Sequence, residues 1–93
     1  MFDRILKRMR ELVRIRSYVM TLHAEDEMDS DGLTIYDIES AVLTGQITER
    51  QRDHASAEWK YLLSGQSLAG DSVTVVAKFG PTNKLVFITV FRE

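Results

Sequence analysis

The hydrophobic period of this chain changes once, at Gly45, from 3.6 residues to 2. Before Gly45 the apolar residues recur at i, i+3 and i+4, as in amphipathic helices, and after it they alternate, as in half-buried strands. With 93 residues the chain has room for one small domain. We therefore expect a single domain over residues 1–93 with an α+β fold, in which two or three N-terminal helices pack on one face of a four-stranded antiparallel sheet.

Residues 1–16 form the first predicted helix, and residues 17–93 form the predicted α+β core. Residues 2–15 carry one apolar stripe, with arginines and lysines on the other side. Residues 18–20 fit either a short extended segment or a link between helices. Thr21 is a suitable N-cap for a second helix that ends near residue 30, and Gly32 is a suitable left-handed stop.

The third predicted helix has the clearest start signal. Thr34 is an N-cap, and Asp37 three residues later can complete a capping box. Leu33 and Ile38 are spaced as a hydrophobic staple, and Gly45 ends the helix.

Four strands follow, at residues 46–52, 58–64, 72–79 and 85–92, with turns at 65–71 and 80–83. Their connections are short enough to make neighbouring strands antiparallel. Strict alternation in the last strand places Leu85, Phe87, Thr89 and Phe91 on one face.

Charge is unevenly distributed along the chain. Residues 1–16 hold six basic and two acidic side chains, a net charge of +4, whereas residues 23–39 hold seven acidic side chains and no Lys or Arg. Such runs are commonly solvated faces, or two helices of opposite charge lying side by side. The alternatives are a basic helix that faces RNA, or a charged docking surface for a partner.

Composition excludes several classes of protein. The absence of cysteine excludes disulfides and thiolate metal sites. No apolar run approaches the roughly 18 residues that a bilayer span needs, and the charged first twelve residues do not fit a signal peptide. We therefore expect a cytoplasmic protein without a membrane partner.

The two histidines are the first candidates for chemistry. His23 and Glu27 stand one helical turn apart, a spacing that can orient an imidazole for general acid–base work. The pair could also hold a metal, but a third ligand is not evident, so no metal or other cofactor is expected. The alternative is an exposed histidine that merely pairs with a carboxylate. His54 follows Asp53 and fits a surface loop.

Basic residues of the strand half are the second group of candidates. On one open sheet face they could converge on a phosphodiester, with Tyr61 and Trp59 nearby, and stabilise the charge that develops on phosphorus. They could equally be edge residues that prevent aggregation between strands. The group comprises Arg50, Arg52, Lys60, Lys78 and Arg92.

The stretch from His23-Ala24 through Gly32-Leu33-Thr34 to Gly45-Gln46-Ile47-Thr48-Glu49 resembles a small family known as domain of unknown function 4258. The resemblance continues through an aromatic strand ending in glycine (59–65), a valine-rich strand (73–77) and a closing Thr-Val-Phe (89–91). It covers roughly residues 17–92 and leaves the first helix as an addition.

That family is similar to the RelE/BrnT-like toxins, which are small α+β ribonucleases usually neutralised by an antitoxin protein. The resemblance implies a metal-independent endoribonuclease with RNA as substrate and an antitoxin as protein partner. Separately, the small size of the domain favours self-association as a homo-oligomer. It implies His23 as general acid or base. By location alone, the other catalytic candidates are Arg50, Arg52, Lys78 and Arg92, and the RNA-binding candidates are Lys60 and Tyr61.

The chain departs from the family pattern at two positions. Glu27 and Asp31 stand where the family commonly has basic residues. Negative charge there repels RNA and weakens electrostatic help for the transition state. The alternative function is therefore a catalytically degenerate member that acts as a protein–protein interaction module, through self-association or partner docking by its charged helices.

Overall fold

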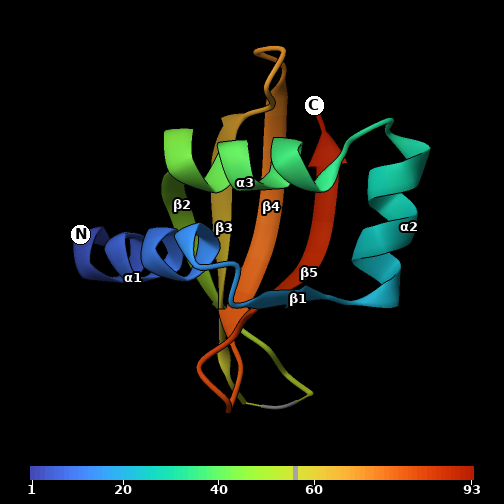
Figure 1. Ribbon diagram of the computed structural model, residues 1–93. Helices are drawn as coiled ribbons and strands as arrows, with labels where there is room; N and C mark the ends of the chain where they lie inside the picture. The colour runs from blue at the N-terminus through green and yellow to red at the C-terminus, as the bar shows by residue number, and fades with distance from the viewer. Residues whose placement is uncertain (56) are drawn as a thin grey trace.

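The computed structural model describes residues 1–55 and 57–93 and has an α+β fold, as predicted (Figure 1). Along the chain the elements are α1 (Asp3–Arg14), β1 (Tyr18–Met20), α2 (Leu22–Ser30), α3 (Ile35–Thr44), β2 (Gln46–Arg52), β3 (Trp59–Gln66), β4 (Ser72–Phe79) and β5 (Leu85–Arg92). None of the helices in these described residues is long and apolar enough to cross a membrane.

The sheet has five strands in the order β1-β5-β4-β3-β2, so the prediction of four antiparallel strands was incomplete. Strands β2 to β5 form the expected antiparallel meander. The short β1 adds a fifth strand parallel to β5, with Tyr18 opposite Leu85 and Met20 opposite Phe87. Three residues carry too little pattern to identify a strand, and it is pairing with the distant β5 that makes this segment extended.

The predicted helix ends are confirmed. The Thr21 hydroxyl accepts the backbone N–H of Ala24 at the start of α2. Gly32 has the left-handed φ of 67° that follows α2. Thr34 and Asp37 form the full capping box at α3, in which the Asp37 carboxylate accepts the Thr34 backbone N–H at 2.8 Å. Side chains thereby satisfy backbone donors that a helix start leaves without partners.

The helices cover one face of the sheet and leave the other face open. Figure 1 shows α3 lying across the sheet in front of β2 to β5 and α1 lying at the β2 and β3 side, with α2 beside β5 at the opposite end of the helix layer from α1. The core lies between the helices and the sheet, and α1 is an integral part of it. Its fully buried large side chains are Met9 and Leu12 from α1, Ile38 and Val42 from α3, and Leu63, Val73, Val75, Leu85, Phe87 and Val90 from the sheet.

The prediction that side chains alternate strictly between the two faces along β5 was wrong. Ala77 pairs with Phe87 but Val76 pairs with Thr89, so Ile88 is an extra residue and the pairing shifts there. A bulge of this kind reverses the inward and outward sides along the rest of the strand. Val90 is accordingly fully buried, whereas Phe91 is 39% exposed.

Strand β3 is also longer than predicted, because it continues through Gly65 to Gln66. A Cβ at Gly65 would lie 2.8 Å from the Ala41 Cα. This glycine therefore serves the close approach of α3 to the sheet, and the turn begins only after Gln66.

Candidate functional site

His23 is the second residue of α2 and lies at the β5 side of the sheet. Its side chain is 68% exposed, and its Nε2 is 3.1 Å from Oε1 of Glu27. The predicted pair therefore forms. The same Glu27 oxygen also accepts the backbone N–H of Val90 at 3.3 Å, so this carboxylate is shared between the imidazole and the sheet.

Glu27 and Asp31 have a structural role at the edge of β5. Strand β1 covers only the first part of β5, and α2 lies beside the remainder. There the Glu27 carboxylate accepts the Val90 N–H, and the Asp31 carboxylate accepts the Arg92 N–H at 2.8 Å. The unpaired N–H groups at an exposed strand edge need a hydrogen-bond acceptor or an element that covers them. Acidic residues at these two positions thus complete the sheet.

Arg50 and Arg52 lie on β2, at the opposite edge of the sheet. Both guanidinium groups stack on the Trp59 ring, at 4.0 Å and 4.1 Å from its centroid. Arg52 also donates to the Ala57 carbonyl oxygen at 2.7 Å. Cation–π contacts of this kind hold the arginines against the neighbouring strand.

The remaining candidates are dispersed. Lys78 is paired with Glu58 at 3.2 Å, and the Arg92 guanidinium lies 3.9 Å from the Asp71 carboxylate. Lys60 is half-buried opposite Gln51. Tyr61 is only 7% exposed, with its ring edge-to-face against Phe2 and Phe79. The Tyr61 ring is therefore enclosed in the core and is not open to stacking on a base.

The structure does not bring the predicted catalytic group together. Strands β4 and β3 separate β5 from β2, and neighbouring strands lie about 4.8 Å apart. The imidazole of His23 and the guanidinium groups of Arg50 and Arg52 therefore stand at opposite edges of the sheet. Within residues 1–55 and 57–93, no three His, Asp or Glu side chains are grouped as metal ligands.

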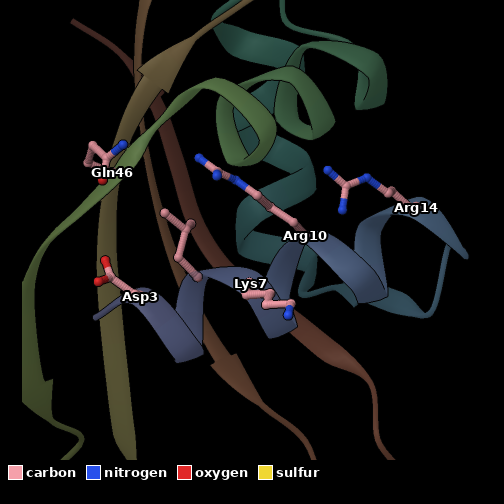
Figure 2. A pocket seen from close by; sticks show the side chains of 6 residues that line it. Asp3, Lys7, Arg10, Arg14 and Gln46 are labelled. Atoms are coloured by element: carbon pink, nitrogen blue, oxygen red, sulfur yellow. The ribbon is translucent and has the colours of Figure 1, made fainter. Parts of the chain in front are cut away.

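A basic pocket lies instead along α1. Figure 2 shows Lys7, Arg10 and Arg14 projecting from one side of this helix, with Asp3 and Gln46 nearby. The pocket has a volume of about 320 Å³. The spacing of these cations at i, i+3 and i+7 was visible in the sequence. What the sequence did not show was that the start of β2 would close the pocket on the other side.

Two hydrogen bonds fix Arg10 in this pocket, whereas Lys7 and Arg14 form no ion pair with the part of the chain that the structure describes. Its guanidinium donates to the carbonyl oxygens of Val42 at 3.1 Å and Gly45 at 2.8 Å, at the C-terminal end of α3. These carbonyls lack helical partners and carry partial negative charge. Across the described residues, no carboxylate lies within ion-pair distance of Lys7 or Arg14.

Two side chains have shifted pKa values. Burial, together with the hydrogen bond that the Tyr18 hydroxyl donates to Glu39 at 2.5 Å, raises the pKa of Tyr18 to about 12. The pKa of Asp37 is lowered because its carboxylate accepts the backbone N–H groups of Thr34 and Leu68. Both groups stabilise the fold, and neither lies in the basic pocket.

Comparison with known protein families gives a match over most of the chain. Residues 20–92 match the family described as Domain of unknown function (DUF4258). No curated protein and no solved structure matches the chain. The family match begins at the end of β1 and runs through α2, α3 and the four antiparallel strands, so that the chain belongs to the DUF4258 family.

Proposed function

We propose that this protein is a non-enzymatic protein–protein interaction module that docks an acidic segment of a partner on the basic side of α1. The observation that carries the proposal is the pocket in which Lys7 and Arg14 stand without carboxylate partners among the described residues, on either side of the anchored Arg10. The acidic helix α2 lies at the far end of the helix layer, so it leaves these charges uncompensated (Figure 1).

Two further features support docking over catalysis. The cations predicted to be catalytic contact other side chains. Arg50 stacks on Trp59, Lys78 pairs with Glu58, and Arg92 lies near Asp71. The anchoring of Arg10 gives the pocket a rigid floor, and complementary charge across an interface favours fast encounter and correct orientation.

The test is fluorescence anisotropy with a labelled oligoglutamate peptide, at low and high NaCl. We expect binding at low salt that weakens as salt rises, because the attraction is screened. Lys7→Glu should lower the affinity by about tenfold or more. The matched control is Lys84→Glu, an exposed lysine in the β4–β5 turn, which should change it by less than about twofold.

Three outcomes contradict the proposal. The first is the absence of binding at low salt, and the second is an equal loss in Lys7→Glu and Lys84→Glu. The third is tighter binding of a single-stranded RNA with the same number of charges, which would identify a nucleic-acid surface.

The second candidate function is the metal-independent endoribonuclease of the RelE/BrnT type. The observation that favours it is the exposed His23 imidazole held by Glu27 at 3.1 Å, a geometry that suits proton transfer from a 2′-hydroxyl. It predicts RNA cleavage in EDTA that His23→Ala abolishes and that His54→Ala, an exposed histidine outside α2, leaves unchanged. Intact RNA at high protein concentration, or equal activity in both variants, removes this candidate.

A further inference from the structure

A second pocket lies between β1, α2 and the start of α3, and it combines an apolar floor with an acidic rim. Its volume is about 410 Å³, within the range of roughly 300–1,000 Å³ that is usual for binding sites. The floor is formed by Tyr18, Met20, Met28 and Ile35, and the rim by Glu25 and Asp29. Such a surface suits an apolar side chain flanked by positive charge.

The chain itself displays such a group at the end of α1. Ile15 is 71% exposed and stands between Arg14 and Arg16, both also exposed. We call residues 14–16 the basic tip. No carboxylate in residues 1–55 or 57–93 pairs with Arg14 or Arg16. The tip and the pocket are therefore complementary in both polarity and charge.

Arg16 is held in a conformation that a different residue would adopt more easily. Its φ is +56°, in the left-handed region that glycine favours. The backbone N–H of Arg16 donates to Val13, and that of Ser17 donates to Leu12, which together form a Schellman motif. Glycine is the usual residue at this position, so an arginine there points to a use for its side chain.

A short stretch of chain joins the tip to the pocket. The chain leaves α1 and enters β1 (Figure 1), and only Ser17 separates Arg16 from Tyr18, which begins β1 and lines the pocket. A donor and an acceptor that are adjacent on one face can be exchanged reciprocally across a two-fold axis. That reciprocal arrangement gives a closed dimer, whereas a contact made in one direction only gives a ring or an open chain.

We infer that two copies of this chain associate by reciprocal docking, with the basic tip of each copy seated in the acidic-rimmed pocket of the other. Ile15 enters the apolar floor, while Arg16 faces Glu25 and Asp29 of the second copy. The inference rests on the proposed function as an interaction module, and it names a second partner surface, which shares Arg14 with the basic pocket but does not include Lys7.

The test is sedimentation analysis of the full chain over a range of concentrations, with two single substitutions. Arg16→Glu sets a carboxylate at position 16 against Glu25 and Asp29, and Asp29→Arg sets a guanidinium at position 29 against Arg16. Each variant alone should dimerise at least about tenfold more weakly than the parent chain. Mixed together they should form a one-to-one heterodimer with the parental affinity, because both contacts in that pair are again of opposite charge.

Matched controls are available on the same helices. Arg4→Glu in α1 and Asp26→Arg in α2 change the net charge equally but lie outside the tip and the pocket lining. They should dimerise as the parent chain does, and their mixture should show no preference for heterodimers. Circular dichroism of all four variants checks that each is folded.

Three outcomes overturn the inference: a parent chain that stays monomeric at high concentration and low salt, an Arg16→Glu variant that dimerises normally, or a mixture that forms no heterodimer. None of them bears on the oligoglutamate test. A monomer that binds oligoglutamate through Lys7 would refute reciprocal docking and leave the proposed function standing.

Discussion

At the scale of single residues, two helices end in the same motif with different residues at its left-handed position. After α2 the residue is Gly32, with φ +67°, and after α1 it is Arg16, with φ +56°. Both ends show the paired backbone hydrogen bonds of a Schellman motif. A side chain at such a position costs about 1 kcal/mol relative to glycine, so α1 ends at an energetic disadvantage.

Replacing Arg16 with glycine should therefore raise the free energy of unfolding by about 0.5–1 kcal/mol. Gly32→Ala should lower it by about 1 kcal/mol, and only through backbone strain, because a Cβ there meets nothing within 4 Å. Urea denaturation of dilute protein measures both changes. A destabilised Arg16→Gly variant would show that the arginine makes contacts within its own chain.

Tyr18 links β1 to α3 through its hydrogen bond to Glu39. Because its pKa is about 12 in the folded protein and 10.0 ordinarily, the phenol resists ionisation more strongly when folded. Its contribution to stability is complete below pH 10 and is lost as the pH rises from 10 towards 12.

The parent chain should accordingly lose stability from pH 10 to 12 more steeply than Tyr18→Phe. The control is Tyr36→Phe, which removes a tyrosine that is 54% exposed and that makes the smallest contribution to the raised pKa of Tyr18. It should stay much closer to the parent chain than Tyr18→Phe does. Thermal melts across this range measure the difference. Parallel curves for the parent chain and Tyr18→Phe would rule out this role for the phenol.

At the scale of elements, α2 acts as a cover for the free part of β5. The carboxylates of Glu27 in α2 and of Asp31, the residue that caps its C-terminal end, accept strand N–H groups that no neighbouring strand reaches. A buried or half-buried donor left without a partner costs about 1–3 kcal/mol. The acidity of this helix therefore has a structural explanation, at least at Glu27 and Asp31.

Glu27→Ala should lower the free energy of unfolding by about 1–2 kcal/mol, because the Val90 N–H then loses its acceptor. Glu27→Gln keeps a carbonyl oxygen in reach and should restore most of the loss. Glu25→Ala, at an exposed position two residues earlier in α2, should change stability by less than about 0.5 kcal/mol. Amide hydrogen exchange at Val90 provides the local measurement. Unchanged protection of the Val90 N–H in Glu27→Ala would show that the Glu27 carboxylate does not protect it.

At the scale of the whole molecule, two glycines, Gly45 and Gly65, allow α3 to approach the sheet closely. At Gly65 on β3, a Cβ would fall 2.8 Å from both the carbonyl carbon and the Cα of Ala41. At Gly45 it would fall 2.6 Å from the Ser64 carbonyl oxygen. These contacts are with backbone, which cannot rotate away, so the spacing between α3 and the sheet depends on the missing side chains.

Gly65→Ala should therefore destabilise the protein by about 3 kcal/mol or more, since α3 must shift as a unit. Gly70→Ala is the control in the following turn. Its φ is +89° but a Cβ there meets nothing within 4 Å, so its cost should be about 1 kcal/mol. Chemical denaturation compares the two, and equal losses would mean that layer spacing is not the reason for Gly65.

The sequence predicted what depends on neighbours in the chain. The cap at Thr21, the left-handed Gly32 and the capping box of Thr34 and Asp37 were all correct, because each involves residues within one turn. The bulge at Ile88 was not predictable in the same way. It arises from a mismatch between two strands and leaves the local pattern of alternating apolar residues intact.

In the candidate site, too, a contact within one helical turn was predicted and the contacts between strands were not. The His23–Glu27 pair was predicted, since the i, i+4 spacing of a helix places the two side chains together. The sheet-borne cations were expected to converge, yet Arg50 and Arg52 stack on Trp59 while Lys78 and Arg92 pair with nearby carboxylates. The order of the strands in the sheet decided that outcome.

By itself, then, the sequence determined the class of fold, the helix boundaries and the order of the antiparallel strands, because these follow from periodicity and capping along the chain. Only the tertiary structure decided that β1 joins the sheet, that α1 and α2 stand at opposite ends of the helix layer, and that the acidic residues of α2 complete β5. Those facts depend on contacts between segments about 30 to 70 residues apart, whose pairing no local pattern specifies.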